Sequence, residues 1–327
     1  MNLLRRSIVV AAAAIVAAAS GGAAEAQTQL KVVVFPGMSN LMQFAAQSQG
    51  YYAKRGLAVE LVNTPNSTEL RNGLAEGRYH IAHAGIDNAV AQVEASKVDL
   101  FVFMGGNNGN NSLFVRPEIN SYDDLRGKTL AVDAPDTAFA LLAYKMLQER
   151  GLKKGDYQVK SLGAPLARLQ AMTSDPNIAV AILSPPQTAM AQKAGLKNFG
   201  TAVSVIGPYQ SDAGWVLRSW EQANADTLTR YIQANIEGIR WALNPANRAA
   251  LTSLLVEKLK QPQDIIEESL KVSLDQKGYT TDAQIDMAGF DNVLKLRADM
   301  LGTWGGNPPP PTKYLDLSHY RRALAGL

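Results

Sequence analysis

The sequence lacks cysteine altogether, and it has only three histidines among its 327 residues. The absence of cysteine excludes disulfides, thiol nucleophiles and thiolate-ligated metals. His80 and His83 stand three positions apart in a strand-like segment, so their side chains point to opposite faces and cannot hold one metal ion. The motifs of serine hydrolases, zinc proteases, P-loop proteins and dinucleotide-binding proteins are also missing. We therefore expect no catalytic residue, no metal and no cofactor.

A strong charge of either sign is missing as well. The formal net charge is +3, and no basic stripe with interleaved aromatic residues occurs. Nucleic acid is therefore not expected as a partner. The hydrophobic content of 46% and the charged content of 19% are those of an ordinary globular protein. The chain is long enough to form two lobes.

The N-terminus has the pattern of a cleavable signal peptide. Arg5 and Arg6 precede an alanine-rich apolar stretch, and the small residues around Glu25 fit a cleavage site after Ala26. The stretch is too short to favour a membrane-spanning helix. We expect residues 1–26 to be removed and the mature chain to be periplasmic.

Strand-like and helix-like segments alternate over most of the mature chain, which predicts mainly parallel sheets covered by helices. The predicted strands fall into two groups, separated near residue 118, and after a strand at 214–219 the pattern becomes helical. The strands of the first group are 30–35, 57–62, 80–85 and 100–106, and those of the second are 129–134, 157–162 and 178–183. The fold class is therefore α/β with a helical C-terminal region.

Short polar side chains gather in the loops that follow these strands. Open α/β sheets bind ligands at the carboxyl ends of their strands, so we expect a ligand-binding cleft there. The candidate ligand-binding residues in these loops are Met38, Ser39, Asn40, Asn66, Asp87, Asn88, Asn108, Asp136 and Thr137. The alternative is that many of them are only turn and helix-cap residues. Tyr209, beside the second connection between the groups, is added because its ring could stack on a flat ligand.

Four segments together resemble a known family. Their order and spacing are similar to those of the periplasmic substrate-binding components of ABC importers, in the sulfonate, taurine, nitrate and pyrimidine-precursor group. The segments are GYYAKRGLAVELV, ELRNGLAEGRYHIAHAG, SYDDLRGKTLAVDAP and GLKKGDYQVKSLG. The resemblance extends to about Leu243.

The resemblance implies a two-lobed periplasmic-binding-protein fold of type II with one ligand in the cleft. The first lobe is expected at 27–117 plus 213–327 and the second at 118–212, with hinge crossovers near FVRPE and GPYQSDAGW. The implied partners are a small-molecule ligand and the membrane permease of an importer with its ATPase. We expect the protein to work as a monomer.

The loop APDTA departs from the family pattern, which is commonly rich in Gly and Ser and offers backbone amides to an oxyanion. Asp136 in this loop and Asp87 in the matching loop of the first lobe would place two carboxylates at the cleft. If both face it, a ligand that bears N–H groups or is zwitterionic is favoured over a simple oxyanion. The alternative is that Asp133 and Asp136 serve the following helix as a cap and a first-turn acid.

Two other functions stay open on the same fold, because fold does not fix function. A periplasmic lyase or hydrolase could use Asp87 and Asp136 as an acid–base pair. A ligand-sensing domain of a membrane receptor would need a fused signalling segment, and the sequence contains none.

Overall fold

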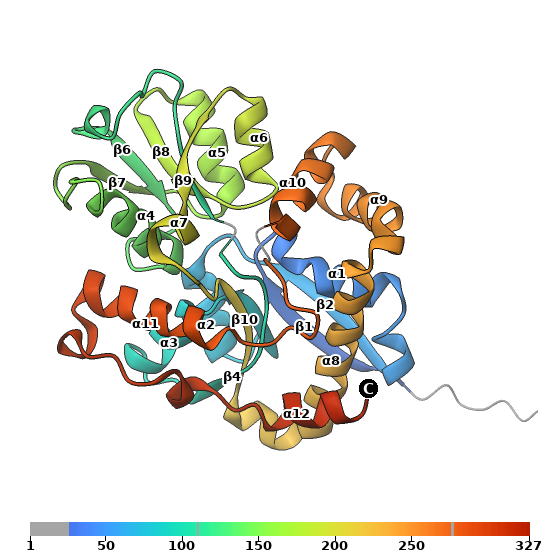
Figure 1. The fold of residues 1–327 in the computed structure, drawn as a ribbon. Helices are drawn as coiled ribbons and strands as arrows, with labels where there is room; N and C mark the ends of the chain where they lie inside the picture. Colours follow the sequence, from blue (N-terminus) through green and yellow to red (C-terminus); the bar gives the residue numbers. More distant parts are fainter. Residues whose placement is uncertain (1–25, 110, 276–277) are drawn as a thin grey trace, which may run out of the picture.

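The computed structural model describes residues 26–109, 111–275 and 278–327, and it forms two α/β lobes (Figure 1). The predicted signal peptide therefore lies outside the described residues except for Ala26. Each lobe is built around one five-stranded sheet, with the second lobe drawn in green above the first. None of the helices among the described residues is long and apolar enough to cross a membrane.

The sheet of the first lobe has the strand order β2-β1-β3-β10-β4. Its strands are β1 (Thr28–Val34), β2 (Leu57–Asn63), β3 (Ile81–Gly85), β4 (Leu100–Gly105) and β10 (Asp212–Leu217). β1 pairs in parallel with β2 and β3, whereas β10 enters between β3 and β4 and runs antiparallel to both. β3, in the centre of the sheet, and β4, at its edge, are both continuous apolar runs and are buried along their whole length.

The sheet of the second lobe repeats this plan in the order β7-β6-β8-β5-β9. Its strands are β5 (Ser112–Val115), β6 (Thr129–Val132), β7 (Gln158–Ser161), β8 (Ile178–Leu183) and β9 (Lys197–Thr201). β5 is the antiparallel strand here, between β8 and β9. Each sheet therefore contains parallel strands and one antiparallel strand. The antiparallel strand follows directly after the chain has crossed from the other lobe.

β5 belongs to the sheet of the second lobe, and this corrects the predicted position of the first crossover. The sequence places the boundary between residues 117 and 118, with FVRPE as the hinge. In the structure Phe114 and Val115 are already paired with β8 in the second sheet, so the chain crosses between Gly105 and Ser112. The second crossover ends at Asp212, where β10 begins in the first sheet.

Helices cover both faces of each sheet (Figure 1). Those that precede β10 in the chain are α1 (Leu41–Ser48), α2 (Ser67–Ala75), α3 (Asp87–Glu94), α4 (Ala138–Gln148), α5 (Pro165–Ser174), α6 (Gln187–Lys193) and α7 (Ala202–Ile206). Those that follow it are α8 (Arg218–Leu243), α9 (Arg248–Leu259), α10 (Gln263–Asp275), α11 (Met287–Leu301) and α12 (Ser318–Ala325). The amphipathic α8 packs its apolar stripe, which includes Leu228, Ile232 and Ile239, against α1 and the first sheet.

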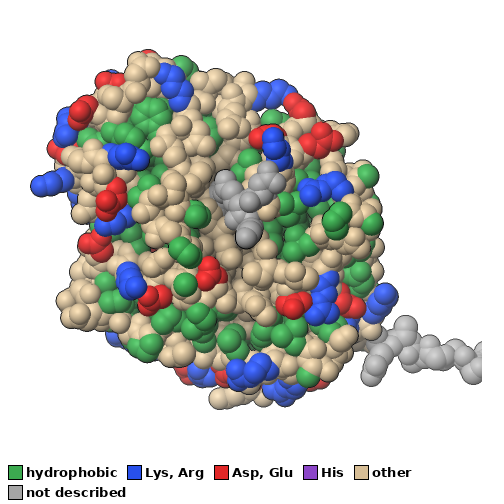
Figure 2. All heavy atoms as spheres, viewed as in Figure 1, with side chains coloured by type: hydrophobic (Ala, Val, Ile, Leu, Met, Phe, Trp, Pro, Cys, Tyr) green, Lys and Arg blue, Asp and Glu red, His purple; other side chains and the backbone are tan. Residues whose placement is uncertain are grey.

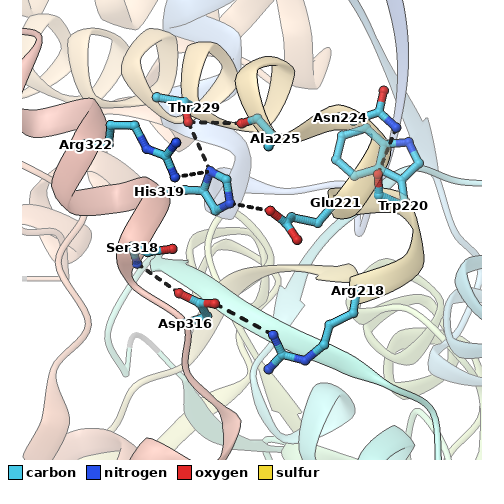
Figure 3. A network of polar contacts seen from close by, with 10 residues as sticks. All are labelled: Arg218, Trp220, Glu221, Asn224, Ala225, Thr229, Asp316, Ser318, His319 and Arg322. Atoms are coloured by element: carbon cyan, nitrogen blue, oxygen red, sulfur yellow. Dashed lines mark hydrogen bonds and ion pairs between the residues drawn. The ribbon is translucent and has the colours of Figure 1, made fainter.

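The C-terminal segment is held against the first lobe by a polar network (Figure 3). His319 of α12 lies between Glu221, whose carboxylate oxygen is 2.6 Å from Nε2, and the Thr229 hydroxyl, 3.0 Å from Nδ1. Arg218 at the start of α8 forms an ion pair with Asp316 at 3.7 Å. These contacts return the chain end to the lobe in which the chain began.

The surface carries both charge signs without a single-sign patch on the face drawn in Figure 2. Lys and Arg side chains alternate there with Asp and Glu side chains around the edge of the molecule. This agrees with the small net charge of +3.

Candidate functional site

A cavity of about 30 Å³ lies between the lobes, next to the two crossovers. We call it the hinge chamber. Its lining residues come from the first lobe, the crossovers and the second lobe: Phe35, Pro36, Gly37, Met38, Ser39, Ala84, Asn107, Asn111, Phe139, Pro165, Ser184, Pro185, Ser211, Asp212, Ser273 and Tyr279. The carboxyl ends of β1, β3 and β8 all meet at this place.

A smaller chamber of about 10 Å³ adjoins it, and the two share Phe35, Phe139 and Pro165 in their walls. We call the smaller one the arginine chamber. Its other lining residues are Ser67, Gly85, Asn88, Asp133, Thr137, Ala138 and Arg168. The two chambers therefore share a wall of two phenylalanines and a proline. The rest of each lining includes polar side chains.

The main acidic group of the hinge chamber is Asp212, at the start of β10. Its carboxylate accepts a hydrogen bond of 2.7 Å from Asn107 Nδ2, and the Ser39 hydroxyl lines the same chamber. Burial raises the pKa of Asp212 to about 6, although the hydrogen bond from Asn107 opposes the rise. This carboxyl can therefore change its charge near neutral pH.

The main basic group of the arginine chamber is Arg168, on α5. Its side chain is buried, and Nη1 donates to the carbonyl oxygen of Gly163 at 2.9 Å. Nε and Nη2 have no hydrogen-bond partner among the described residues. Burial lowers the pKa of Arg168 to about 10, which still leaves the guanidinium charged at neutral pH.

Asp133 lies in the same chamber and connects the two lobes. It follows β6 in the second lobe, and its carboxylate accepts from the Ser67 hydroxyl at 2.5 Å and from the Ser67 backbone N–H at 3.4 Å. Ser67 is the first residue of α2 in the first lobe, where the helix dipole favours a negative charge. Asp133 therefore caps a helix of the opposite lobe and not the helix that follows it in the chain.

Four of the residues expected from the sequence line these chambers. Met38 and Ser39 lie in the hinge chamber, and Asn88 and Thr137 lie in the arginine chamber. Asn88 Oδ1 is buried there without a hydrogen-bond partner among the described residues. The Thr137 hydroxyl donates to the carbonyl oxygen of Ala134 at 2.9 Å, which closes the turn before α4. Ligand binding by these four residues stays a prediction.

Asp87 lines neither chamber, and its binding of a ligand stays a prediction. Its carboxylate turns into the first lobe and accepts from Arg297 of α11 at 2.8 Å, with both side chains buried. Burial raises the pKa of Asp87, and the Arg297 guanidinium opposes that rise. A buried carboxylate needs such a partner, and α11 supplies it.

Asp136 also lies outside the chambers. Its side chain is half exposed at the rim of the inter-lobe space, and it forms an ion pair with Arg71 of α2 at 3.4 Å. Asn66 lies near this rim too, and it is the cap of α2, since its Oδ1 accepts from the Glu69 backbone N–H at 2.8 Å.

The remaining three candidates have other surroundings. Asn40 donates to the carbonyl oxygen of Phe35 at 2.7 Å and so stabilises the loop after β1. Asn108 and Tyr209 line a separate open hollow behind the crossovers, together with residues of the segment before α11. Tyr209 is buried in the crossover itself and is not presented to the chambers.

The charged side chains that line the chambers, Asp133, Arg168 and Asp212, are not among the candidates expected from the sequence. Asp133 was considered only as a cap of its own helix, and Arg168 and Asp212 were not singled out. A signal for Arg168 existed in the helix pattern, because it shares one face of α5 with the buried residues Pro165 and Met172. No group of three or more acidic or histidine side chains able to hold a metal ion occurs among the residues that the structure describes.

Comparison with known proteins gives one family and many related structures. The model of the NMT1-like family matches residues 23–256. No curated protein sequence shows a significant match to the chain.

Three solved structures show how widely this fold is used. The ligand-binding component of an ABC-type import system from Staphylococcus aureus, solved with zinc bound, has 16% identity and a TM-score of 0.77 over 91% of this chain and 99% of that one. The periplasmic nitrate-binding protein NrtA from Synechocystis PCC 6803 has 15% identity and a TM-score of 0.75, over 92% and 89%. The desulfurization enzyme DSZB has 12% identity and a TM-score of 0.65, over 92% and 99%. At these identities the similarity establishes the periplasmic-binding-protein fold and not a ligand.

Proposed function

Since the chain belongs to the NMT1-like family, we propose that it is the solute-binding component of an ABC-type import system. It captures a small organic molecule in the two chambers between its lobes and delivers it to a membrane permease that works with an ATPase. The observation that carries this proposal is the lining of the chambers, to which both lobes and both crossovers contribute. A ligand there touches both lobes only when they are closed, so binding favours closure.

Contacts between the lobes support the closing motion. The Met38 backbone N–H donates to the carbonyl oxygen of Pro185 at 3.3 Å, and that of Ala164 donates to Pro65 at 3.1 Å. Three ion pairs also join the lobes: Arg71–Asp136 at 3.4 Å, Lys145–Asp299 at 2.8 Å and Lys193–Asp264 at 2.5 Å. Most of these ion-pair side chains are partly exposed, and exposed pairs contribute little each. The arrangement can therefore open at small cost when the chambers are empty.

The proposed setting is the periplasm, with the protein acting as a monomer. The signal-like N-terminus and the similarity to the periplasmic nitrate-binding protein NrtA support this setting. The permease would recognise the closed pair of lobes.

We still propose that the protein prefers an N–H-bearing or zwitterionic ligand over a simple oxyanion, but the residues that would cause this preference are different ones. Asp87 and Asp136 line neither chamber, so the chambers give them no support in this role. Asp212 in the hinge chamber is the carboxylate available to a donor group of the ligand, since both oxygens of Asp133 in the arginine chamber accept from Ser67. Arg168 adds a positive charge, so the two chambers together suit a molecule with both an acidic and a donor group.

The positions of Asp87 and Asp136 give no support to the enzymatic alternative. Asp87 is buried against Arg297, and Asp136 is exposed at the rim. We propose that the ligand leaves chemically unchanged.

Native mass spectrometry of the mature protein purified from cells tests the binding role, and solution scattering tests closure. We expect a retained small molecule and a more compact scattering profile with that molecule than without it. The released molecule should have the same mass after incubation with a stoichiometric amount of protein. Identical profiles with and without ligand would contradict the closing mechanism, and turnover products would contradict the transport role.

A further inference from the structure

The guanidinium of Arg168 lines the arginine chamber and keeps one edge of N–H groups without a hydrogen-bond partner among the described residues. We call this edge the open edge. Nη1 of Arg168 is occupied by the Gly163 carbonyl, but Nε and Nη2 are buried and have no partner among the described residues. These two nitrogens form the side edge of the planar guanidinium, which presents two parallel N–H groups. A buried polar group without a partner destabilises the fold, so such an edge calls for a partner from outside the chain.

Asp133 does not fill that role. It lies in the same chamber and raises the pKa of Arg168 by its charge, but it forms no ion pair with Arg168 within 4.0 Å among the described residues. Both of its oxygens are already engaged by Ser67 of the opposite lobe. The negative charge of Asp133 therefore stabilises the guanidinium from a distance and leaves the open edge free.

The walls around the open edge are partly apolar. Phe35, Phe139 and Pro165 form the boundary shared with the hinge chamber, and Asn88 adds an unpartnered amide oxygen from the first lobe. A carboxylate has two oxygens, which match the two parallel N–H groups. A sulfonate or phosphate has further oxygens, which would face the apolar wall or the Asp133 carboxylate without a donor.

We propose that Arg168 binds a carboxylate of the transported molecule, and that this molecule is a small carboxylic acid with a hydroxyl or amino group. The carboxylate occupies the open edge of Arg168 in the second lobe, and the hydroxyl or amino hydrogen is donated to Asn88 Oδ1 in the first lobe. One ligand then joins the two lobes. This inference rests on the proposed solute-binding function and specifies its substrate class.

The test uses ligand-observed NMR and calorimetry on the mature protein with matched probes. The probes are lactate and mandelate as hydroxy acids, their amides as neutral counterparts, and 2-hydroxyethanesulfonate as the sulfonate. We expect the hydroxy acids to bind at least about tenfold more tightly than the amides and the sulfonate, since each charge-assisted hydrogen bond contributes that much.

Substitutions at Arg168 test whether this side chain binds the carboxylate of the probes. Arg168→Met keeps an unbranched apolar side chain and should weaken hydroxy-acid binding at least about a hundredfold, because it removes two charge-assisted bonds. Arg168→Lys keeps the charge without the two-pronged edge and should weaken binding about tenfold. Arg126→Met, an exposed arginine of the same lobe, is the matched control and should bind like the unaltered protein.

Thermal unfolding without ligand excludes a merely structural role. Arg168→Met should melt at the same temperature as the unaltered protein or higher, because it removes a buried charge whose edge is unpartnered. A lower melting temperature together with unchanged binding of the probes would overturn the proposal.

The outcomes separate this inference from the proposed function. If amides or the sulfonate bind as well as the hydroxy acids, or if Arg168→Met binds them equally, the carboxylate contact is wrong while solute binding stands. If the protein retains no molecule from cells and none of the probes binds, both the substrate class and the solute-binding role fail.

Discussion

Two arginines are buried among the residues that the structure describes, and their surroundings differ. Arg297 lies on α11 within the first lobe, and its Nη1 donates to Asp87 at 2.8 Å, although its Nε has no partner among the described residues. Arg168 lies on α5 at the inter-lobe chambers and keeps Nε and Nη2 without a partner among the described residues. The chain thus supplies a carboxylate partner for Arg297. For Arg168 we propose that a carboxylate of the ligand is the partner.

The difference between the two arginines shows how a buried charge can be assigned a role. A charge satisfied by the chain belongs to the fold, because removing its partner leaves an uncompensated ion in a medium of low polarity. A charge that stays unsatisfied at an interface between moving parts belongs to binding. The predictions below test this distinction, beginning with the pair that the chain completes.

The largest effect is expected for Arg297→Met. The change leaves Asp87 buried without its cation, which should lower the free energy of unfolding by about 3–5 kcal/mol. Chemical denaturation of the mature protein measures this value. The double change Asp87→Leu with Arg297→Met should restore most of the loss, because both charges are then gone. A loss under 1 kcal/mol for the single change would show that the pair contributes little to the fold.

Asp212 is a third buried charge, and its partners are neutral. Its pKa is raised to about 6 in the folded protein, so between pH 4 and pH 6 the folded chain holds a proton that the unfolded chain has released. Stability from this group is therefore present below pH 4 and is lost as the pH rises to about 6, by up to about 3 kcal/mol.

Asp212→Asn removes that titration. The variant should be up to about 3 kcal/mol more stable than the unaltered protein at pH 7 and equal to it at pH 4. Denaturation of both proteins at a series of pH values measures the difference, and the control Asp226→Asn, an exposed carboxylate, should leave it unchanged. A difference that does not depend on pH would rule out the titration of Asp212 as its cause.

Most of the fold could be predicted from the sequence, because the strands of parallel sheets are continuous apolar runs. β1, β6 and β8 were expected within two residues of their observed ends. The strand β5 was missed, since Phe114 and Val115 were assigned to the hinge, and β9 was missed because it is a half-exposed edge strand that contains Gly200. Short strands of this kind depend on pairing with distant segments, which a local pattern does not show.

The candidate site was harder to predict, for a physical reason that Asp87 illustrates. Its loop position was predicted correctly as the turn after β3, but its partner Arg297 lies 210 residues further along the chain. Similarly, the loop that contains Asp133 was recognised, whereas its contact with Ser67 joins two lobes. Loops at strand ends can be located by local sequence, and the direction of each side chain is decided by distant contacts.

The inter-lobe contact of Asp133 leads to a prediction of medium size. Ser67→Ala removes the hydroxyl that donates to Asp133 at 2.5 Å and keeps the helix start and its backbone N–H. The closed arrangement should lose about 1–2 kcal/mol, so ligand affinity should fall about five- to thirtyfold while the second lobe stays folded. Calorimetry with the ligand recovered from cells measures the affinity. Thr68→Ala, the neighbouring residue at the open rim, is the control.

The smallest effect is expected for Asp136→Asn, which contrasts an exposed charge with the buried ones. Asp136 is half exposed, its ion pair with Arg71 spans 3.4 Å, and it does not line a chamber. Exposed pairs contribute about 0–1 kcal/mol, so affinity for the recovered ligand should change less than about threefold and the free energy of unfolding by under about 0.5 kcal/mol. Calorimetry at low and high salt should agree within error for the variant, because the screened pair is already absent. A tenfold loss of affinity at both salt concentrations would place Asp136 at the ligand after all and would restore the cleft position that its loop suggested.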